Sequence, residues 1–340
     1  SYLTMRTQTL SLLLLGLGLA AASVLPETRQ EWEEFKSTHS KKYATEEEEY
    51  TRFGIFLDNK KIIAEHNALF EAGEISWGVG MNAFGDLTDA EFKAMYTGQV
   101  MPRDDAKVSC SSYFGTGSAP ESYDHRDHGA VTPVKDQGQC GSCWSFGATG
   151  SAEGQYFKST GQTASLSEQN LLDCAQNWGC NGGGRSDIAL DYVTSSGVNS
   201  ESVYPYEMAQ GWCRQSSAYS TYHCSGCVYT AAWDEQELKD AVASETPVAV
   251  AIDASPLHFQ FYRTGIIDDP TCGTDYPDLN HAVLAVGYGT NSQGQKYWTI
   301  KNSWGTWWGD AGYFQLARDK GNMCGVSSDT VFAKGPCYAA

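Results

Sequence analysis

Two cysteines three residues apart, Cys140 and Cys143, stand in a glycine-containing turn that leads into an apolar run, and this stretch constrains the fold more than any other. Glycine allows a tight turn and the close approach of another segment. The run that follows, with Trp144, Phe146 and Ala148, predicts a helix whose first turn holds Cys143. A thiol there faces unpaired backbone N–H groups and the positive end of the helix dipole, which favour the nucleophilic thiolate. Taken alone, the pair could equally be structural cysteines, a redox pair or part of a zinc site.

Length, net charge and cysteine content limit the number of domains, the partners and the compartments that suit this chain. Its 340 residues suffice for one large or two modest domains. A net charge of −18 makes nucleic acid and anionic membranes poor partners, and it suits an acidic compartment, where protonation of carboxylates lowers self-repulsion. Eleven cysteines predict an oxidising compartment, and because the number is odd, at least one has no partner within the chain.

The N-terminal residues 1–22 predict a secretory signal, in which residues 1–4 precede the expected initiator Met5. Arg6 supplies the basic region, residues 10–19 supply the apolar region, and three alanines follow as a cleavage site. The apolar run is too short to predict a membrane span, and no later run reaches about 18 apolar residues. The chain has no Asn-x-Ser/Thr sequon, so an N-glycan tag cannot direct it to lysosomes.

Residues 23–118 are expected to form a separate, mostly helical unit with one long helix over residues 48–67. Its members recur at helical spacing on one face: Glu48, Arg52, Phe56, Asn59, Ile63 and Asn67. Glu48 and Arg52 are placed to pair at i,i+4. We expect this pair and the acidic run at residues 46–49 to hold the helix at neutral pH and to loosen it when the carboxylates are protonated.

Shorter elements flank that helix. Trp32, Phe35 and Tyr43 are spaced for an amphipathic helix before it. Residues 80–86 alternate in character and predict a short strand. Residues 100–118 are rich in serine and glycine and predict an exposed linker in which processing could occur.

Residues 119–340 change from helical to strand patterns. Residues 166–174 predict a capped helix. Strands are predicted over four later segments: residues 248–252, 282–286, 297–301 and 312–316. Helices first and strands second predict an α+β protein with two lobes.

Prosegment, nucleophile, His and Asn motifs follow one another in the chain and carry a specific resemblance. The long helix matches the ERFNIN signature, and residues 80–86 match the G-x-N-x-F-x-D signature, both of propeptides in the cathepsin L-like branch of the papain family of cysteine proteases. Residues 137–146 resemble the family's nucleophile motif. His281 and Asn302 lie 138 and 159 residues beyond Cys143, near the separation typical of papain-like enzymes. The resemblance covers nearly all of residues 23–335.

The resemblance implies a preproenzyme with the papain-like α+β fold, in which a helical left lobe faces a β-barrel-like right lobe. Residues 23–118 would be an inhibitory propeptide that lies backwards through the active-site cleft, and residues 119–340 would be the mature peptidase domain. His125 stands where the family usually has tryptophan, so the packing there is expected to differ.

The resemblance also implies the catalytic residues. Cys143 would be the nucleophile, His281 would stabilise the thiolate as an imidazolium and protonate the leaving amine, and Asn302 would orient His281. The Gln137 side chain and the Cys143 backbone N–H would form the oxyanion hole, and Trp304 would shield the His281–Asn302 hydrogen bond from water. Activity would then need a deprotonated Cys143 and a protonated His281, which predicts a bell-shaped pH profile.

Substrate-binding residues follow by the same resemblance. Gly182 and Gly183 would bind the substrate backbone. The S2 pocket would be lined by Gly184, Arg185, Ala251, Leu279, Ala282 and Asp329. A carboxylate at the pocket floor predicts that Arg is accepted at P2 alongside Leu, with Arg185 as the partner of Asp329 in the empty pocket. The alternative is that Asp329 turns away to solvent.

The cysteines divide into two sets. The family's three disulfides carry over as Cys140–Cys180, Cys174–Cys213 and Cys272–Cys324, with Cys143 free. Four cysteines lie outside the family pattern: Cys110, Cys224, Cys227 and Cys337. The Cys224-x-x-Cys227 pair could bind zinc, but an oxidising compartment favours disulfides, and the connectivity of these four stays open. No metal or cofactor is expected.

These features predict a cathepsin L-like cysteine endopeptidase, made as a self-inhibited zymogen and active at acidic pH. Endopeptidase is favoured over dipeptidase activity because the chain lacks an occluding insertion with paired histidines. The alternatives are an inactive homologue acting as a binding or storage protein and a zinc-dependent interaction module. Expected partners are protein and peptide substrates, the chain's own propeptide and cystatin-like inhibitors. We expect a monomer in the secretory pathway, bound for a lysosome- or vacuole-like compartment or for digestive secretion.

Overall fold

The computed structural model describes residues 28–98, 108–176 and 179–340, and these fall into two compact units. The first unit comprises residues 28–61 and 81–87, and the second comprises residues 62–80 and the described residues from Thr88 onward. The predicted secretory signal lies outside the described residues. None of the helices among the described residues has the length and apolar character that a membrane span requires.

Helices dominate the first half of the chain and strands the second, which confirms the α+β class. A helical segment at residues 28–38 is followed by α2 (Glu46–Glu71), α3 (Asp89–Tyr96), α4 (Cys143–Thr160), α5 (Glu168–Cys174), α6 (Gly179–Gly182), α7 (Ser186–Ser195) and α8 (Glu235–Ser244). Four 3₁₀ helices are η1 (His125–His128), η2 (Leu257–Phe261), η3 (Tyr276–Asp278) and η4 (Met323–Gly325). The strands are β1 (Trp77–Val79), β2 (Ser111–Ser112), β3 (Tyr123–Asp124), β4 (Val198–Asn199), β5 (Thr221–Tyr229), β6 (Val248–Ile252), β7 (Tyr262–Ile267), β8 (His281–Thr290), β9 (Lys296–Lys301), β10 (Tyr313–Ala317) and β11 (Thr330–Ala339).

The first unit is built on an aromatic cluster. Trp32, Phe35 and Phe56 are buried, and the Trp32 and Phe35 rings stack at 5.4 Å. Tyr43 packs against this cluster from beyond the helical segment, so the expected helix ends before it. Asp86 accepts hydrogen bonds from Lys41 Nζ at 2.7 Å and Tyr43 Oη at 2.9 Å.

The two propeptide signatures contact each other within this unit. Asn59 donates from Nδ2 to the carbonyls of Gly85 and Leu87, at 3.0 and 2.9 Å. The strand predicted over residues 80–86 is wrong, because the segment turns: the Asn82 side chain accepts the backbone N–H of Phe84 at 2.9 Å. The long helix is confirmed as α2, where the polar members of the signature bind backbone.

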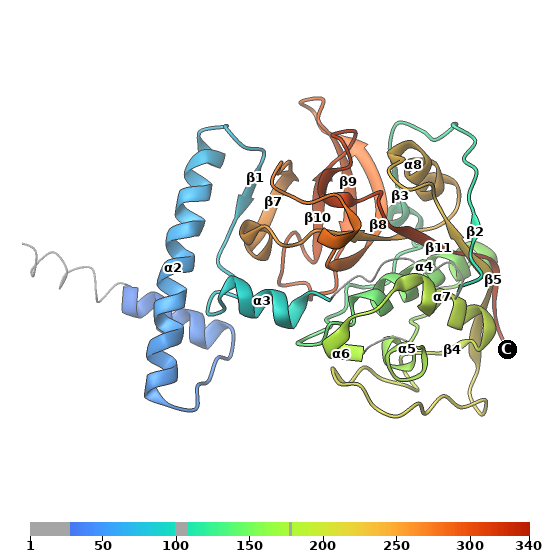
Figure 1. Cartoon of the computed structure of the whole chain (residues 1–340), viewed down its shortest axis with the longest axis horizontal. Coiled ribbons are helices and arrows are strands. Elements are labelled where there is room, and N and C mark those ends of the chain that lie inside the picture. The colour runs from blue at the N-terminus through green and yellow to red at the C-terminus, as the bar shows by residue number, and fades with distance from the viewer. Residues whose placement is uncertain (1–27, 99–107, 177–178) are drawn as a thin grey trace, which may run out of the picture. The chain divides into compact units, whose positions relative to one another are not determined.

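The second unit contains an eleven-stranded sheet in the order β1-β7-β10-β9-β8-β6-β11-β5-β2, with β3 beside β8 and β4 beside β5 (Figure 1). All four predicted strands are confirmed, as β6, β8, β9 and β10. The described strands form an open sheet that runs from β1 to β2, and the expected barrel-like closure is wrong. The order brings strand β9 against β8, which determines the geometry of the site described below.

Both edges of the sheet are supplied by residues from before position 119. Strand β1 pairs antiparallel with β7, with Trp77 opposite Gly265. Strand β2 pairs parallel with β5, with Ser111 opposite Val228. Figure 1 shows β1 beside β7 and β2 beside β5. The segments predicted as propeptide and linker therefore extend the sheet of the second unit.

Helix α4 is the buried centre of the second unit. Almost all of its residues up to Tyr156 are buried, and its glycines allow close approach: a Cβ on Gly154 would lie 2.5 Å from Pro247.

His125, in the place of the family's tryptophan, is buried and its Nε2 lies 2.7 Å from the carbonyl of Val242. Burial lowers the pKa of His125 to about 4, so it packs there as a neutral ring.

Five disulfides connect the described cysteines, and Cys143 is free. The three expected from the resemblance are confirmed: Cys140–Cys180, Cys174–Cys213 and Cys272–Cys324. The other two are Cys110–Cys227 and Cys224–Cys337. Cys224 and Cys227 are thus both oxidised, with different partners, which removes the thiols that zinc would need. No cluster of His, Cys, Asp or Glu suited to a metal ion occurs in the described part of the chain.

Candidate active site

Cys143 is the first residue of α4, as the sequence predicts. The turn before it is held by the Cys140–Cys180 disulfide and by the Gly141 N–H, which donates to the Cys180 carbonyl at 2.9 Å. A side chain at Gly141 would clash, since its Cβ would lie 2.6 Å from that carbonyl oxygen. The backbone N–H of Ala282 donates to Cys143 Sγ at 3.4 Å, so the thiol lies against the residue next to His281.

His281 and Asn302 come from neighbouring strands. His281 begins β8 and Asn302 directly follows β9, and the pairing of these strands brings the two side chains together. His281 Nε2 lies 2.8 Å from Asn302 Oδ1. The Trp304 ring stacks on His281 with centroids 4.5 Å apart and is fully buried, so water is kept from this hydrogen bond. His281 Nδ1 has no hydrogen-bond partner among the described residues, which leaves that nitrogen available for a thiol.

Gln137 lies beside the same site. Its backbone N–H donates to the Ser303 carbonyl at 2.8 Å, and its Oε1 accepts the Ser303 hydroxyl at 2.6 Å. The amide nitrogen Nε2 donates to the carbonyl of Cys140 at 2.9 Å and to the carbonyl of Tyr96 at 3.3 Å. Trp304 Nε1 donates to the same carbonyl at 3.3 Å. The carbonyl oxygen of Tyr96 therefore occupies two side-chain donors of the site.

Residues 88–98 cover the site. Helix α3 begins with a capping box at Thr88 and Glu91, and its Phe92 packs edge-on against Trp304 at 5.2 Å. Gly98 donates its N–H to the carbonyl of Asn280 at 2.8 Å. A Cβ on Gly98 would lie 3.0 Å from the carbonyl oxygen of Gly141 and 3.5 Å from Cys143 Sγ, so the chain passes directly over the thiol.

Burial under this segment changes the titration of the site. Only 2% of Cys143 is exposed, and burial raises the pKa of its thiol, although backbone N–H groups such as that of Ala282 oppose the shift. Burial also lowers the pKa of His281 to about 4, opposed by the hydrogen bond to Asn302. In the covered precursor both groups are therefore driven toward their neutral forms, in contrast to the charged pair expected from the sequence.

The predicted substrate-binding residues only partly share one cavity. Gly182 ends α6, and Gly183 lies beside Gly98, 3.3 Å from where a Cβ on Gly98 would lie. A separate cavity of about 20 Å³, room for about one water molecule, is lined by Gly184, Arg185, Ala251, Ala282 and Asp329. Sequence reasoning missed its other lining residues, which are Ser186, Asp187, Ala249, Val250 and Val331. Leu279 packs against Ala251 but lines a different pocket, with Gly98 and Asn280.

Arg185 is held by a residue that the sequence did not single out. Its Nε donates to Asp187 Oδ1 at 2.9 Å, both side chains are buried, and Tyr229 Oη donates to Asp187 Oδ2 at 2.7 Å. Desolvation lowers the pKa of Arg185, but the hydrogen bond to Asp187 and the charges of Asp187 and Asp329 outweigh it and raise that pKa. The signal available in the sequence was the spacing of Arg185 and Asp187 at the start of α7.

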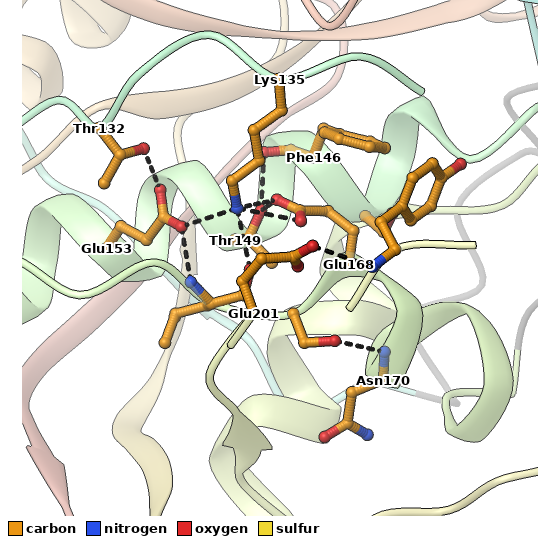
Figure 2. Close-up of polar contacts among 12 residues, drawn as sticks. Thr132, Lys135, Phe146, Thr149, Glu153, Glu168, Asn170 and Glu201 are labelled. Carbon is orange, nitrogen blue, oxygen red and sulfur yellow. Dashed lines mark hydrogen bonds and ion pairs between the residues drawn. The ribbon is translucent and has the colours of Figure 1, made fainter. Parts of the chain in front are cut away.

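Figure 2 shows a cluster of charged side chains around Lys135, Glu153 and Glu168. Lys135 Nζ contacts Glu168 Oε1 at 2.7 Å and Glu153 Oε1 at 3.2 Å, and Thr149 Oγ1 donates to Glu168 at 2.6 Å. Burial raises the pKa of Glu168 to about 7, opposed by Lys135. The cluster joins helices α4 and α5 to the segment that leads into Gln137. A cavity next to it is also lined by Asn302 and Ser303.

Comparisons with known proteins agree with this geometry. Residues 119–334 match the papain family of cysteine proteases, and residues 32–92 match the cathepsin propeptide inhibitor domain. The chain is similar to digestive cysteine proteinase 2 of Homarus americanus, 45% identical over 322 residues that span 93% of this chain and 96% of that protein. It is 42% identical to cathepsin L of Sarcophaga peregrina over 334 residues, 95% of this chain and 98% of the relative. The solved digestive procathepsin L 3 from Tenebrio molitor larval midgut has a TM-score of 0.84 and 44% identity, covering 91% of this chain and 99% of that one.

Proposed function

This chain belongs to the papain family of cysteine proteases as a cathepsin L-like zymogen with a propeptide inhibitor domain, and we propose that it is an endopeptidase acting through Cys143 and His281. The observation that carries the proposal is the free Cys143 at the start of α4, beside a histidine whose other ring nitrogen is bound by Asn302. The inactive-homologue alternative has no supporting observation.

The proposed chemistry follows from these positions. The Cys143 thiolate attacks the peptide carbonyl carbon, and the electron pair of the C=O bond moves to oxygen, where Gln137 Nε2 and the Cys143 N–H would stabilise it. The intermediate collapses as the C–N bond breaks, and imidazolium His281 protonates the leaving amine. Neutral His281 then takes a proton from water, which attacks the thioester and releases the acid and the thiolate.

The covering segment accounts for inhibition of the precursor. The Tyr96 carbonyl takes the Gln137 donor, and Gly98 excludes water and substrate from Cys143. Removal of residues 88–98 would rehydrate the thiol and the imidazole, which relieves the desolvation that keeps both neutral. We infer that the charged pair forms after the propeptide leaves.

Peptide hydrolysis by acid-treated precursor, measured with and without a thiol, tests the proposed activity. An epoxide thiol reagent should label Cys143 in the acid-treated protein and not in the covered precursor, because the thiol is buried there. Absence of both labelling and hydrolysis after the propeptide has been removed would favour an inactive binding or storage protein.

Two histidines in contact suggest how acid releases the propeptide. His66 of α2 and His258 of η2 have ring centroids 4.5 Å apart, and His66 Nε2 lies 3.1 Å from the carbonyl of Trp77. Burial lowers the pKa of both rings, and His258 lowers that of His66 further, whereas the charge of Asp269 opposes both shifts. This contact joins α2 of the proposed propeptide to η2 of the proposed peptidase domain, and burial favours the uncharged rings there.

Propeptide release should therefore accelerate as pH falls. Released histidines take up protons below their ordinary pKa of 6.5, whereas the docked pair resists, so docking weakens progressively from about pH 6.5 downward. Conversion of precursor, followed on gels, should be faster at pH 4.5 than at pH 7.5. His66→Gln should flatten this dependence between pH 6.5 and 5, and the exposed His128→Gln should not. Equal rates at pH 4.5 and 7.5 in the wild-type protein would exclude the mechanism.

The S2 proposal predicts that Arg and Leu are both accepted at P2. One cation and two carboxylates, Arg185 with Asp187 and Asp329, line the cavity, so it is net negative. Asp329→Ala should lower kcat/KM for an Arg-Arg substrate by roughly 10- to 150-fold, since a charged hydrogen bond contributes about 1.5–3 kcal/mol. The Leu-Arg substrate is the internal control and should change little. Rejection of Arg at P2 by the wild-type enzyme at pH 6 would show that Asp329 does not serve the pocket.

The last part of the proposal concerns the compartment in which the protease acts and its inhibitors. Relatives described as digestive proteinases and as cathepsin L support the secretory pathway. Within it we propose either an acidic lysosome-like compartment or digestive secretion. We also propose that the protease is a monomer that cystatin-like inhibitors bind in the cleft used by substrates.

A further inference from the structure

Residues 108–118 lie between the two family matches, which end at residue 92 and begin at residue 119. They are nevertheless attached to the peptidase domain. Cys110 forms a disulfide with Cys227, and the next two residues form β2 against β5. The ladder continues as the Tyr113 N–H donates to the Tyr229 carbonyl at 2.8 Å. This segment is an edge strand of the peptidase domain.

Side chains fix the rest of the segment to the same domain. The Tyr113 ring packs edge-on against Phe332 at 5.5 Å, and its hydroxyl lies 2.8 Å from Ser244 Oγ. Asp240, on α8, accepts the backbone N–H groups of Gly117 and of Ala119, the latter at 3.1 Å. In the described part of the predicted linker, residues 108–118, most side chains are exposed, but the backbone N–H groups of Ser109, Tyr113 and Gly117 are hydrogen-bonded to the rest of the second unit.

The disulfide restricts where processing can succeed. Hydrolysis of a peptide bond on the C-terminal side of Cys110 consumes one water and leaves Cys110–Cys227 intact, so the propeptide would stay covalently attached. Gly98, which covers Cys143, is only twelve residues before Cys110. A propeptide tethered so close would remain at a high effective concentration near the site and continue to inhibit.

We propose that maturation cuts on the N-terminal side of Cys110, so that the mature enzyme begins before this residue and keeps it as a disulfide-anchored edge strand. The boundary predicted from the sequence, with the mature domain starting at Ala119, then moves upstream. The inference rests on the proposed proteolytic maturation of the zymogen and adds the position of the cut.

The N-terminus of the processed enzyme tests the proposal. Full-length precursor is activated at acidic pH, quenched with the epoxide reagent, and analysed by N-terminal sequencing and by non-reducing peptide mapping. The expected product starts before Cys110 and yields a peptide linking Cys110 to Cys227. A product that starts anywhere from Ser111 to Ala119 overturns the proposal. Peptide hydrolysis measured before the quench reports separately on the proposed activity.

A variant pair tests whether the disulfide protects the segment. In Cys110→Ser/Cys227→Ser, the strand loses its covalent anchor, and the mature N-terminus should move downstream into residues 111–119 with time. The matched control is Cys224→Ser/Cys337→Ser, which removes the neighbouring disulfide of the same sheet and should keep the wild-type N-terminus. The same downstream shift in both double variants, or in neither, would show that the Cys110–Cys227 disulfide does not determine the position of the mature N-terminus.

Discussion

Cys143→Ala should reduce peptide hydrolysis to background and leave the full-length precursor unprocessed. Among the described residues Cys143 is the free cysteine, and no other thiol lies in the site to replace it. Removing a nucleophile from a catalytic unit costs a factor on the order of 10⁶ in kcat. The measurement is fluorogenic peptide hydrolysis together with gel conversion of the precursor after acid treatment.

Asn302→Ala is compared with Cys143→Ala because we expect it to lose only part of the activity. Asn302 Oδ1 accepts a hydrogen bond from His281 Nε2 and orients the ring, so its loss should lower kcat and leave activity measurable. Thermal melting of both variants shows whether they are folded, since the buried Cys143 site has close neighbours. Undiminished hydrolysis by folded Cys143→Ala would end the assignment of the nucleophile.

The part of the fold that the sequence predicts is the part determined by local pattern. The helix after Cys143 and the buried strands β6 and β8 are short apolar runs with clear bounds. Strand β2 has two residues and exists because it pairs with β5, so no local pattern could reveal it. Residues 80–86 alternate like a strand, but the hydrogen bond from Phe84 to the Asn82 side chain closes a turn instead.

The residues of the site also divide into those that local motifs predict and those that only tertiary packing brings together. His281 and Asn302 were found through motifs, and the pairing of β8 with β9 supplies the geometry that the motifs alone lack. The partners of Lys135 were not found, because its contact with Glu168 joins residues 33 positions apart through tertiary packing. The pairing of Cys110 with Cys227 could not be predicted either, because residue spacing does not determine disulfide connectivity.

Lys135→Met should destabilise the protein by about 3–5 kcal/mol, because removing one partner leaves buried charges uncompensated. Glu153 and Glu168 each have 2% of the side chain exposed, and both contact the Lys135 ammonium group. The matched control is Lys158→Met, whose partner Glu245 is 37% exposed, and such a surface pair contributes about 0–1 kcal/mol. Chemical denaturation of each variant in the Cys143→Ala background gives the free energies of unfolding without self-cleavage.

The pH dependence and a second substitution identify the cause of that loss. The pKa of Glu168 is already raised to about 7 by burial, and without Lys135 it should rise further. The folded state then binds a proton that the unfolded state releases at its ordinary pKa near 4.5, so the variant is relatively stable at pH 5 and loses stability as pH rises toward 8. Lys135→Met/Glu168→Gln removes one of the two carboxylates that lose their partner and should recover part of the loss at pH 8. A loss in Lys135→Met that is independent of pH and unchanged by Glu168→Gln would mean that lost packing, and not buried charge, destabilises the variant.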